Sequence, residues 1–396
     1  MVGHGRITTR RLMAVACAGL LTFGSILAFL GATLPELRAR LGFDMARSGT
    51  LFSFLFLPQI PMSFVAGPLI DRFGKKPILV LGSLTAAAAL LGIGLASSYR
   101  VLAALVCFLG LGASFVNSSS NTLVPDLYPE NPSSAMNLGN VFFSLGAVFF
   151  PLVVTLFSAR LGLTLTMGLI ALFVALPGVL ALLQTFPPAL AGPGFKWDDV
   201  RKATLDPSIL FLAVVLLFYS ALETSTGGWL RIYAEQAFGA SARVSGLILT
   251  AFFGSMMVGR LAASFIAKKL RGSWLVMGSA VGALLGLVLL SLAPDIRVAT
   301  GGAVICGLFY GPIFPTTAGT ASTYFPRIFG TVFGVLMVVA FTGSMALPLA
   351  IGYIAKDTTV RNGIWMIAAS AVLLVIAQCV FVIHERRRFL RIVASG

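Results

Sequence analysis

Glu223 is the residue of this sequence with the clearest capacity for chemistry, because it is an acidic side chain inside a long apolar run. It lies in the run 208–230 and is followed by Thr224, Ser225 and Thr226. A carboxylate in apolar surroundings is stable only if it is paired, protonated or in contact with water. We therefore expect Glu223 to accept hydrogen bonds from the hydroxyl groups of a bound solute, to exchange a proton with a wet cavity, or to do both. The alternatives are a hydrogen bond between two helices in a dry interface and a hydrated position close to the surface.

Four asparagines provide neutral hydrogen-bonding groups in two further apolar runs. Asn117 and Asn121 are four residues apart, and Asn137 and Asn140 are three apart, so each pair shares one face of a helix. Side-chain amides can replace the water around a hydroxylated solute without leaving a buried polar group unpaired. We expect at least one pair to line a solute pathway. The alternative is that the amides only hydrogen-bond neighbouring helices to one another.

Three aromatic side chains, Tyr219, Trp229 and Tyr310, could stack on the apolar face of a ring-shaped solute. An aromatic face complements C–H groups, and the polar tip of a tyrosine or tryptophan can hydrogen-bond. Tyr219 precedes Glu223 by four residues and therefore lies on the same helix face. Trp229 lies near the end of its apolar run, where anchoring at a membrane interface is the stronger alternative.

The elements that must position these groups are helices that cross a membrane. The chain has 396 residues, of which 58% are hydrophobic and 10% charged, and so much apolar surface exceeds what a water-soluble globule buries. Crossing about 30 Å of hydrocarbon takes roughly 20 helical residues, and apolar runs of that length recur along the whole chain. They are continuous rather than alternating, which favours helices over a barrel. The sequence therefore predicts an all-α membrane protein with twelve transmembrane helices.

A polar segment, 187–207, divides the chain into two halves. Its prolines and glycines predict a cytoplasmic linker between residues 1–186, a first bundle of six helices, and residues 208–396, a second bundle of six helices with a cytoplasmic tail. Basic residues at 268–271 follow the eighth predicted span as those at 72–76 follow the second, which predicts two pseudo-symmetric halves. The predicted spans are 12–36, 48–69, 77–97, 101–124, 136–158, 163–186, 208–230, 242–266, 273–293, 297–321, 329–354 and 363–383.

The formal net charge of +15 does not indicate a nucleic-acid partner, because the basic residues lie at the ends of apolar runs and form no separate basic domain. With both termini in the cytoplasm, the basic residues are more numerous on the cytoplasmic side, as the positive-inside rule requires. We therefore expect a multi-pass protein of a cell inner membrane, in contact with membrane lipid and acting as a monomer.

The sequence shows no pattern that indicates catalysis. Its cysteines all lie in apolar runs, and no group of cysteine, histidine and acidic residues has the spacing of a metal site. A serine, histidine and acid arrangement for hydrolysis and a glycine-rich phosphate loop with its lysine are also missing. We expect neither a metal nor another cofactor, and no enzyme activity.

The segment Gly67 to Pro77 is a charged turn between two apolar runs. Its pattern, Gly-x-Leu-x-Asp-Arg-x-Gly-Lys-Lys, resembles the loop between the second and third helices of major facilitator superfamily transporters. The resemblance implies a conformational latch in which the aspartate contacts the eleventh helix, near Phe329. The alternative is a loop whose charges only set the membrane orientation. The residues assigned to the latch are Gly67, Asp71, Arg72, Gly74, Lys75 and, in the second half, Arg260.

Arg260 has two further interpretations. It can pair with a carboxylate or with backbone carbonyls near the hinge of the second half, or its long side chain can reach the membrane interface.

Three other segments are similar to the fucose, galactose and glucose symporter group of that superfamily. Gly110 to Ala147 is similar to its fourth and fifth helices, Tyr219 to Leu230 to its seventh, and Gly311 to Thr316 to its tenth. The acid that such symporters carry early in the fourth helix is absent here, which leaves Glu223 as the candidate coupling group. The glycine pattern typical of the fifth helix of drug antiporters is also missing.

We therefore expect a secondary active transporter that exposes one central site to each side of the membrane in turn. The expected solute is small and polar, in the first instance a sugar, driven by a proton or sodium gradient or moving passively. The alternatives are a transporter of an amphiphile or drug, favoured by the phenylalanine-rich run around Phe143 and Phe149, and a sensor or scaffold without transport. The candidate solute-binding residues are Glu223, Tyr219, Asn117, Asn121, Asn137, Asn140, Trp229 and Tyr310.

Overall fold

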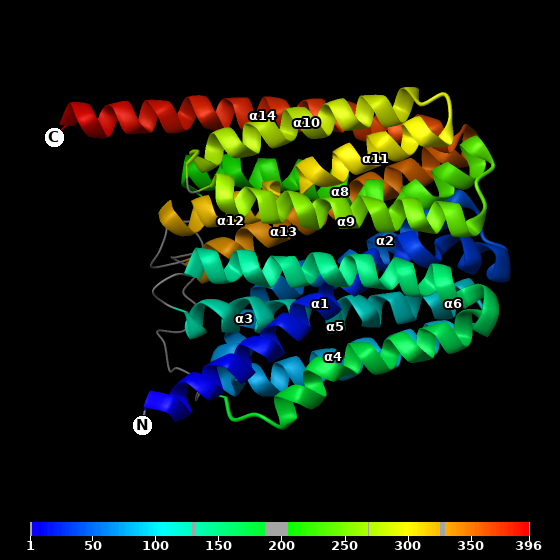
Figure 1. The fold of residues 1–396 in the computed structure, drawn as a ribbon, viewed down its shortest axis with the longest axis horizontal. Coiled ribbons are helices and arrows are strands. Elements are labelled where there is room, and N and C mark those ends of the chain that lie inside the picture. Colours follow the sequence, from blue (N-terminus) through cyan, green and yellow to red (C-terminus); the bar gives the residue numbers. More distant parts are fainter. Residues whose placement is uncertain (1, 129–131, 187–204, 268, 325–328, 396) are drawn as a thin grey trace.

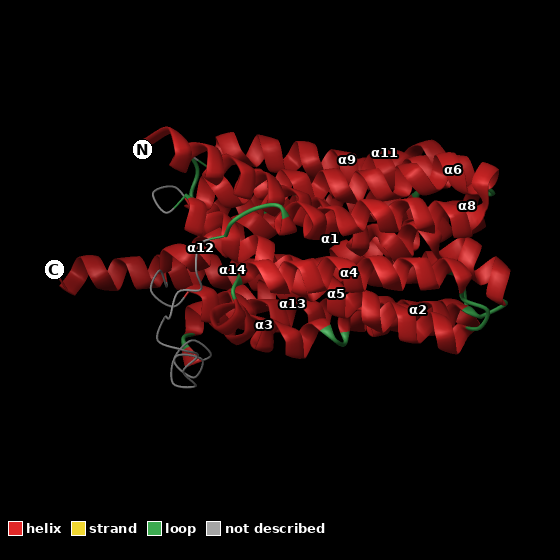
Figure 2. Cartoon of the chain, turned by 90° about the horizontal axis from the view of Figure 1, so that it is seen from below, coloured by secondary structure: helices red, strands yellow, loops and turns green. Residues whose placement is uncertain are grey.

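Long helices running side by side make up the protein, and both chain termini lie at the same end of the bundle (Figures 1 and 2). We call this the terminal end, and the opposite end the distal end. The computed structural model describes residues 2–128, 132–186, 205–267, 269–324 and 329–395, and within these ranges it holds helices and no strands. The prediction of an all-α membrane protein is confirmed for this part of the chain.

The helices of the N-terminal half are α1 (Val2–Leu41), α2 (Met45–Phe56), α3 (Gln59–Phe73), α4 (Lys75–Leu95), α5 (Tyr99–Leu127) and α6 (Pro132–Leu182). Those of the C-terminal half are α8 (Pro207–Phe238), α9 (Ala242–Ile266), α10 (Gly272–Leu292), α11 (Ile296–Tyr310), α12 (Ile313–Tyr324), α13 (Phe329–Asp357) and α14 (Val360–Ser395). The two halves occupy different sides of the bundle, with α4, α5 and α6 below α9, α10, α11 and α14 in Figure 1.

In the described residues, eleven segments are long and apolar enough to cross a membrane. This is one fewer than the sequence predicts, because the expected fifth and sixth spans, 136–158 and 163–186, follow each other within α6. The apolar part of α6, Leu138–Leu182, has 45 residues, about twice the roughly 20 that one crossing requires. Gly162 interrupts it with φ 76° and ψ 158°, a conformation that favours glycine.

The helix ends at the distal end follow from local sequence. The side chain of Asp44 caps α2 by accepting a hydrogen bond from the backbone N–H of Arg47, and Ser241 and Asp295 cap α9 and α11 in the same way. These are the residue types that satisfy the free N–H groups of a first helical turn. Gly239 ends α8 in the left-handed conformation typical of a helix C-terminus.

Glycines allow the helices to pack closely within and between the two halves. In the N-terminal half, a Cβ added at Gly112 of α5 would lie 2.6 Å from the backbone nitrogen of Ala86 in α4. Between the halves, a Cβ at Gly352 of α13 would lie 2.8 Å from the Cα of Gly49 in α2, and one at Gly31 of α1 would overlap the carbonyl of Gly227 in α8. Small residues permit such contact between membrane helices, where packing rather than the hydrophobic effect drives association.

We expect Gly112→Ala to destabilise the protein, although alanine is the better helix former by about 1 kcal/mol. The added methyl group has no room between α4 and α5, and overpacking of this kind costs about 1–3 kcal/mol. Thermal unfolding of purified protein in detergent should show a lower midpoint. The matched control is Gly278→Ala in α10, where an added Cβ meets no described atom within 4 Å, so its midpoint should be unchanged or higher. Equal midpoints for the two variants would contradict the packing described here.

Candidate functional site

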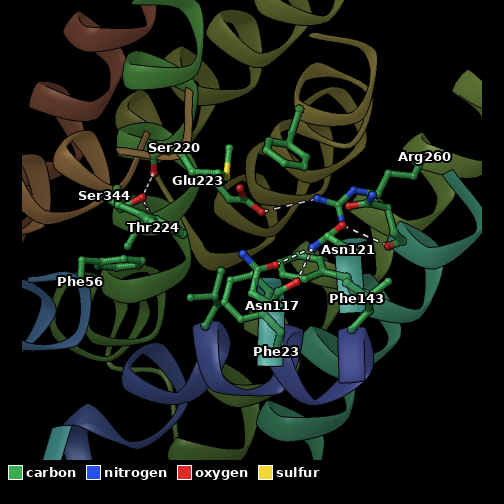
Figure 3. Close-up of a pocket in the computed structure, with 16 residues that line it drawn as sticks. Phe23, Phe56, Asn117, Asn121, Phe143, Ser220, Glu223, Thr224, Arg260 and Ser344 are labelled. Carbon is green, nitrogen blue, oxygen red and sulfur yellow. Dashed lines mark hydrogen bonds and ion pairs between the residues drawn. The ribbon is translucent and has the colours of Figure 1, made fainter. Parts of the chain in front are cut away.

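A cavity of about 60 Å³ lies between the two halves, near the middle of the bundle. This volume has room for several water molecules, and its walls combine polar groups with five phenylalanine rings (Figure 3). The N-terminal half contributes Leu20, Phe23, Leu27, Phe56, Asn117, Asn121, Asn140 and Phe143, and the C-terminal half contributes Ser220, Glu223, Thr224, Arg260, Phe314, Met337, Phe341 and Ser344. The site exists only where the two halves meet.

Glu223 of α8 faces Arg260 of α9 across one part of this cavity (Figure 3). The Nη2 of Arg260 lies 3.7 Å from the Oε1 of Glu223, and the two side chains are 3% and 16% exposed. A separation of 3.7 Å is too long for a hydrogen bond, although opposite charges at this distance attract strongly when they are shielded from water. The buried carboxylate is therefore balanced by a buried cation.

Arg260 is anchored on the N-terminal half as well as on its own half. Its Nη1 donates hydrogen bonds to the Oγ of Ser144 at 2.6 Å and to the carbonyl oxygen of Asn140 at 3.3 Å, both in α6. Its Nε donates to the carbonyl oxygen of Gly311 at 3.3 Å, and its guanidinium carbon lies 4.8 Å from the centre of the Phe143 ring. These contacts hold the guanidinium in one place and leave its Nη2 directed at Glu223.

Two of the four predicted asparagines form a hydrogen-bonded pair in the wall of the cavity. The Nδ2 of Asn121 donates to the Oδ1 of Asn117 at 2.6 Å and to its carbonyl oxygen at 3.2 Å. This bond leaves the Oδ1 of Asn121 and the Nδ2 of Asn117 for other partners. Asn140 also lines the cavity. The side chain of Asn137 lies outside the part of the chain that the structure describes.

The side of the cavity away from Arg260 offers fewer free polar groups to a solute. There the Thr224 hydroxyl donates to the Oγ of Ser344 at 3.0 Å, and Ser344 donates to the carbonyl oxygen of Ser220 at 3.2 Å. These donors are thus used within the protein. The neighbouring rings of Phe56 and Phe341 lie 5.8 Å apart, and Figure 3 shows Phe56 and the hydroxyl groups on the side opposite Arg260.

The three predicted aromatic residues are buried next to the cavity, and none is among the residues that line it. The Tyr219 ring packs against Phe314 at 6.5 Å and Tyr310 at 6.1 Å, and the Tyr310 hydroxyl lies 3.2 Å from that of Thr226. Trp229 is fully buried 6.3 Å from Phe52 of α2, so it is not at the membrane interface. Its position was misjudged because sequence spacing does not show that α2 covers this face of α8.

The predicted latch residues lie in different parts of the protein. Gly74 joins α3 to α4 with φ 83°, as a tight turn requires, and Lys75 pairs with Asp126 of α5 at 2.6 Å within the N-terminal half. Arg72 is exposed. The surroundings of Gly67 and the side chain of Asp71 lie outside the described part of the structure.

Arg260 pairs with the Glu223 carboxylate and with the carbonyl oxygens of Gly311 and Asn140, as the first of its two interpretations expects. It is 4% exposed, it contacts the cavity, and it does not reach the membrane interface. The sequence shows its charge but not which helix face it occupies or what packs there.

A second group of charged residues, near the distal ends of α1 and α8, also joins the two halves. Arg231 of α8, 2% exposed, donates to Glu36 of α1 through Nη1 at 2.9 Å and Nη2 at 2.6 Å, and also to the carbonyl oxygen of Ala32. Its Nε lies 3.2 Å from the Oε1 of Glu235, which accepts a hydrogen bond from Ser245 of α9 at 2.7 Å. We call these residues the distal network.

Arg231 is not among the site residues predicted from the sequence. The available signal was the spacing of Arg231 and Glu235, an i,i+4 pair near the end of an apolar run, together with Glu36 near the end of another.

Comparison with known proteins places the chain in a family. The model of the Major Facilitator Superfamily matches residues 12–341 and 212–391. The chain belongs to this superfamily. The cis,cis-muconate transport protein of Acinetobacter baylyi is 23% identical over 375 residues, covering 90% of each chain. The MFS-type transporter YfkL of Bacillus subtilis is 24% identical over 309 residues, covering 74% of this chain and 76% of the relative.

The crystal structure of a variant of FucP, the fucose:proton symporter of Escherichia coli, has a similar fold. It superposes with a TM-score of 0.72 at 14% identity, covering 94% of this chain and 99% of the other. The relatives are transporters rather than enzymes. This confirms the prediction that the chain is not an enzyme and the prediction that it belongs to the major facilitator superfamily.

We expect Glu36→Gln to open the distal end more often, because breaking a buried ion pair that joins two bodies costs about 3–5 kcal/mol. A single cysteine at Leu27, a cavity residue of α1, would report this in a background without the native cysteines. A membrane-impermeant thiol reagent added on the distal side should label it several-fold faster when Glu36 is changed. Arg243→Gln, which removes an exposed charge at the same end, serves as the control and should not alter the rate. Unchanged labelling with Glu36→Gln would show that the distal network does not hold this end closed.

Proposed function

We propose that this protein is a secondary active transporter that carries a small polar solute through the central cavity by alternating access. The observation that supports this most directly is the composition of the cavity, in which both halves place polar side chains around one space. Glu223 and Arg260 come from the C-terminal half, and the pair Asn117 and Asn121 comes from the N-terminal half. A solute held there would contact both halves, so a movement of one half relative to the other would carry it from one side to the other.

The membrane arrangement that goes with this function has twelve transmembrane helices. Counting α2 with α3 as one span, α11 with α12 as another, and α6 as two spans on either side of Gly162 gives six in each half. We propose these to be the pseudo-symmetric bundles 1–186 and 208–396 joined by the linker 187–207. We place both termini in the cytoplasm and the protein in an inner membrane, as a monomer. In this orientation the distal network lies on the outer side, and its bonds correspond to a state that is closed to the outside.

The solute class has a first candidate and an alternative. A sugar is our first candidate, because the asparagines and Glu223 supply donors and acceptors for hydroxyl groups. An amphiphile is the alternative, and the phenylalanine rings of the cavity support it. One relative is named for transport of cis,cis-muconate, so organic acids belong among the solutes to be tested.

We assign coupling to Glu223, the acidic residue of the cavity wall. Protonation would remove its charge and weaken its attraction to Arg260, so a proton gradient can bias the state of the site. The hinge from Gly67 to Lys75 stays our candidate for a latch on the cytoplasmic side, and Tyr219, Tyr310, Trp229 and Asn137 stay candidates for supporting the solute site.

The test of this function is counterflow in proteoliposomes. Labelled sugars, organic acids and amphiphiles are offered outside vesicles preloaded with the same unlabelled solute, with and without imposed proton or sodium gradients. We expect at least one small polar solute to exchange, and its net accumulation to respond to a gradient. Absence of exchange for every solute, with correctly inserted protein, would favour a sensor or scaffold.

Glu223→Gln should separate exchange from coupling. The variant keeps the shape of the side chain but cannot release a proton, so counterflow should persist while gradient-driven accumulation is lost. Asp357→Asn, an exposed acid in the last turn of α13, is the matched control and should retain both. If Glu223→Gln left accumulation and its pH dependence intact, Glu223 would not be the coupling group.

A further inference from the structure

The two charged groups of the cavity are less completely bonded than those of the distal network. Arg231 binds Glu36 through two short bonds, whereas Arg260 reaches Glu223 through one contact of 3.7 Å. Arginine has five N–H donors in a rigid fork. Three of those of Arg260 are used by Ser144, Asn140 and Gly311. The two on Nη2 make no hydrogen bond of good geometry within the described residues, and the Tyr219 hydroxyl lies close to both Arg260 and Glu223. These two donors face the cavity together with the Glu223 carboxylate.

A neutral solute does not use this arrangement fully. A hydroxyl group between Arg260 and Glu223 would bridge them with single bonds, but it would bring no negative charge to the guanidinium. A carboxylate would accept charge-assisted hydrogen bonds from Nη2, and it would become a second anion next to Glu223. Two carboxylates that share one cation repel each other in a site of low polarity, so one of them takes up a proton.

We propose that the transported solute is a small organic anion whose carboxylate binds Arg260 while Glu223 takes up a proton from water. This inference rests on the proposed transport function and narrows its solute class, placing an organic anion ahead of the sugar named there as first candidate. Before binding, the site holds one cation and one anion. After binding, it holds Arg260 with the solute carboxylate and a neutral Glu223. One anion and one proton thus enter together, and the net charge of the cavity does not change.

The groups around Glu223 indicate that this residue is the one that takes up the proton. The other charged or titratable groups near it are Arg260 of α9, Tyr219 of its own helix and Tyr310 of α11. The cavity residues of α1, α12 and α13 are Leu20, Phe23, Leu27, Phe314, Met337, Phe341 and Ser344, none of which carries a charge. Among the described residues that line the cavity, Glu223 is therefore the acid that can exchange a proton while the solute is bound.

The remaining walls suit the rest of such a molecule. Phe23 and Phe143, whose ring centres lie 5.6 Å apart, present apolar surface next to Arg260 (Figure 3). The Asn117 and Asn121 pair offers one further donor and one further acceptor. Because Arg260 is also bonded to Ser144 and Asn140 of α6, a carboxylate bound to it is connected to both halves.

The test compares acids with neutral molecules of matched shape on the purified full-length protein. Benzoate and gluconate are the acids, and benzamide and glucitol are their neutral matches. We expect at least one acid to raise the thermal midpoint and to be exchanged by proteoliposomes, and neither neutral match to do so. In weakly buffered solution, a pH indicator should show uptake of about one proton per bound acid at a pH where the free acid is ionised. Uptake into vesicles should follow the pH gradient and be insensitive to membrane potential.

Variants of the two charged residues test the assignment to these side chains. Arg260→Gln should reduce exchange of the acid on the order of 100-fold, and Arg260→Lys should recover part of it, because lysine keeps the charge without the fork. Arg243→Gln, a charge removal on the exposed part of the same helix, should leave exchange unchanged. Glu223→Gln should still bind the acid but take up no proton.

The outcomes separate this inference from the proposed function. Exchange of neutral sugars that persists in Arg260→Gln would overturn the organic-anion assignment and leave a transporter of a polar solute. Acid binding to the wild type without proton uptake would overturn the exchange at Glu223, even if the Arg260 variants did not fold. If no solute of either kind moved or bound, the proposed function and this inference would both fail.

Discussion

The buried attraction between Glu223 and Arg260 is the interaction around which the rest of this structure is arranged. A charge in the hydrocarbon region of a membrane is unfavourable by several kcal/mol unless it has a partner or water. Here the carboxylate comes from α8 and the cation from α9, and the cation is also held by α6 of the other half. The charges therefore require the two halves to meet at this level and a polar space to remain between them.

The charges of the distal network also need partners, and they find them in a different way. Four of the five N–H donors of Arg231 are directed at Glu36, Glu235 and the Ala32 carbonyl, so its main role is to close a contact between the halves. Close glycine contacts between α1 and α8 and between α2 and α13 lie beside it. A closely bonded cluster at one end and a less completely bonded pair in the middle are what a transporter needs if it is to be shut on one side while its site stays available.

The helices could be predicted from the sequence because the membrane imposes their length and composition. Apolar runs of about 20 residues identify nearly every membrane-spanning segment, and the pattern from Gly67 to Lys76 pointed to the superfamily. Glu223 and the pair Asn117 and Asn121 were found for the same reason, since polar side chains in apolar runs are exceptional. The break in α6 at Gly162 lies between the predicted spans 136–158 and 163–186, but the length of the turn was not predicted, because a glycine that permits a turn does not show where the flanking helices end.

The sequence by itself determined that this is a helical membrane protein of the major facilitator type with an acid in its seventh predicted span. Only the tertiary structure decided that Arg260 faces that acid, that Arg231 joins Glu36, and that Trp229, Tyr219 and Tyr310 are packed behind the cavity wall. The reason is physical. Spacing along one helix shows which residues share a face, but the partner of a buried charge comes from another helix, and the packing of glycines against backbone sets which faces meet.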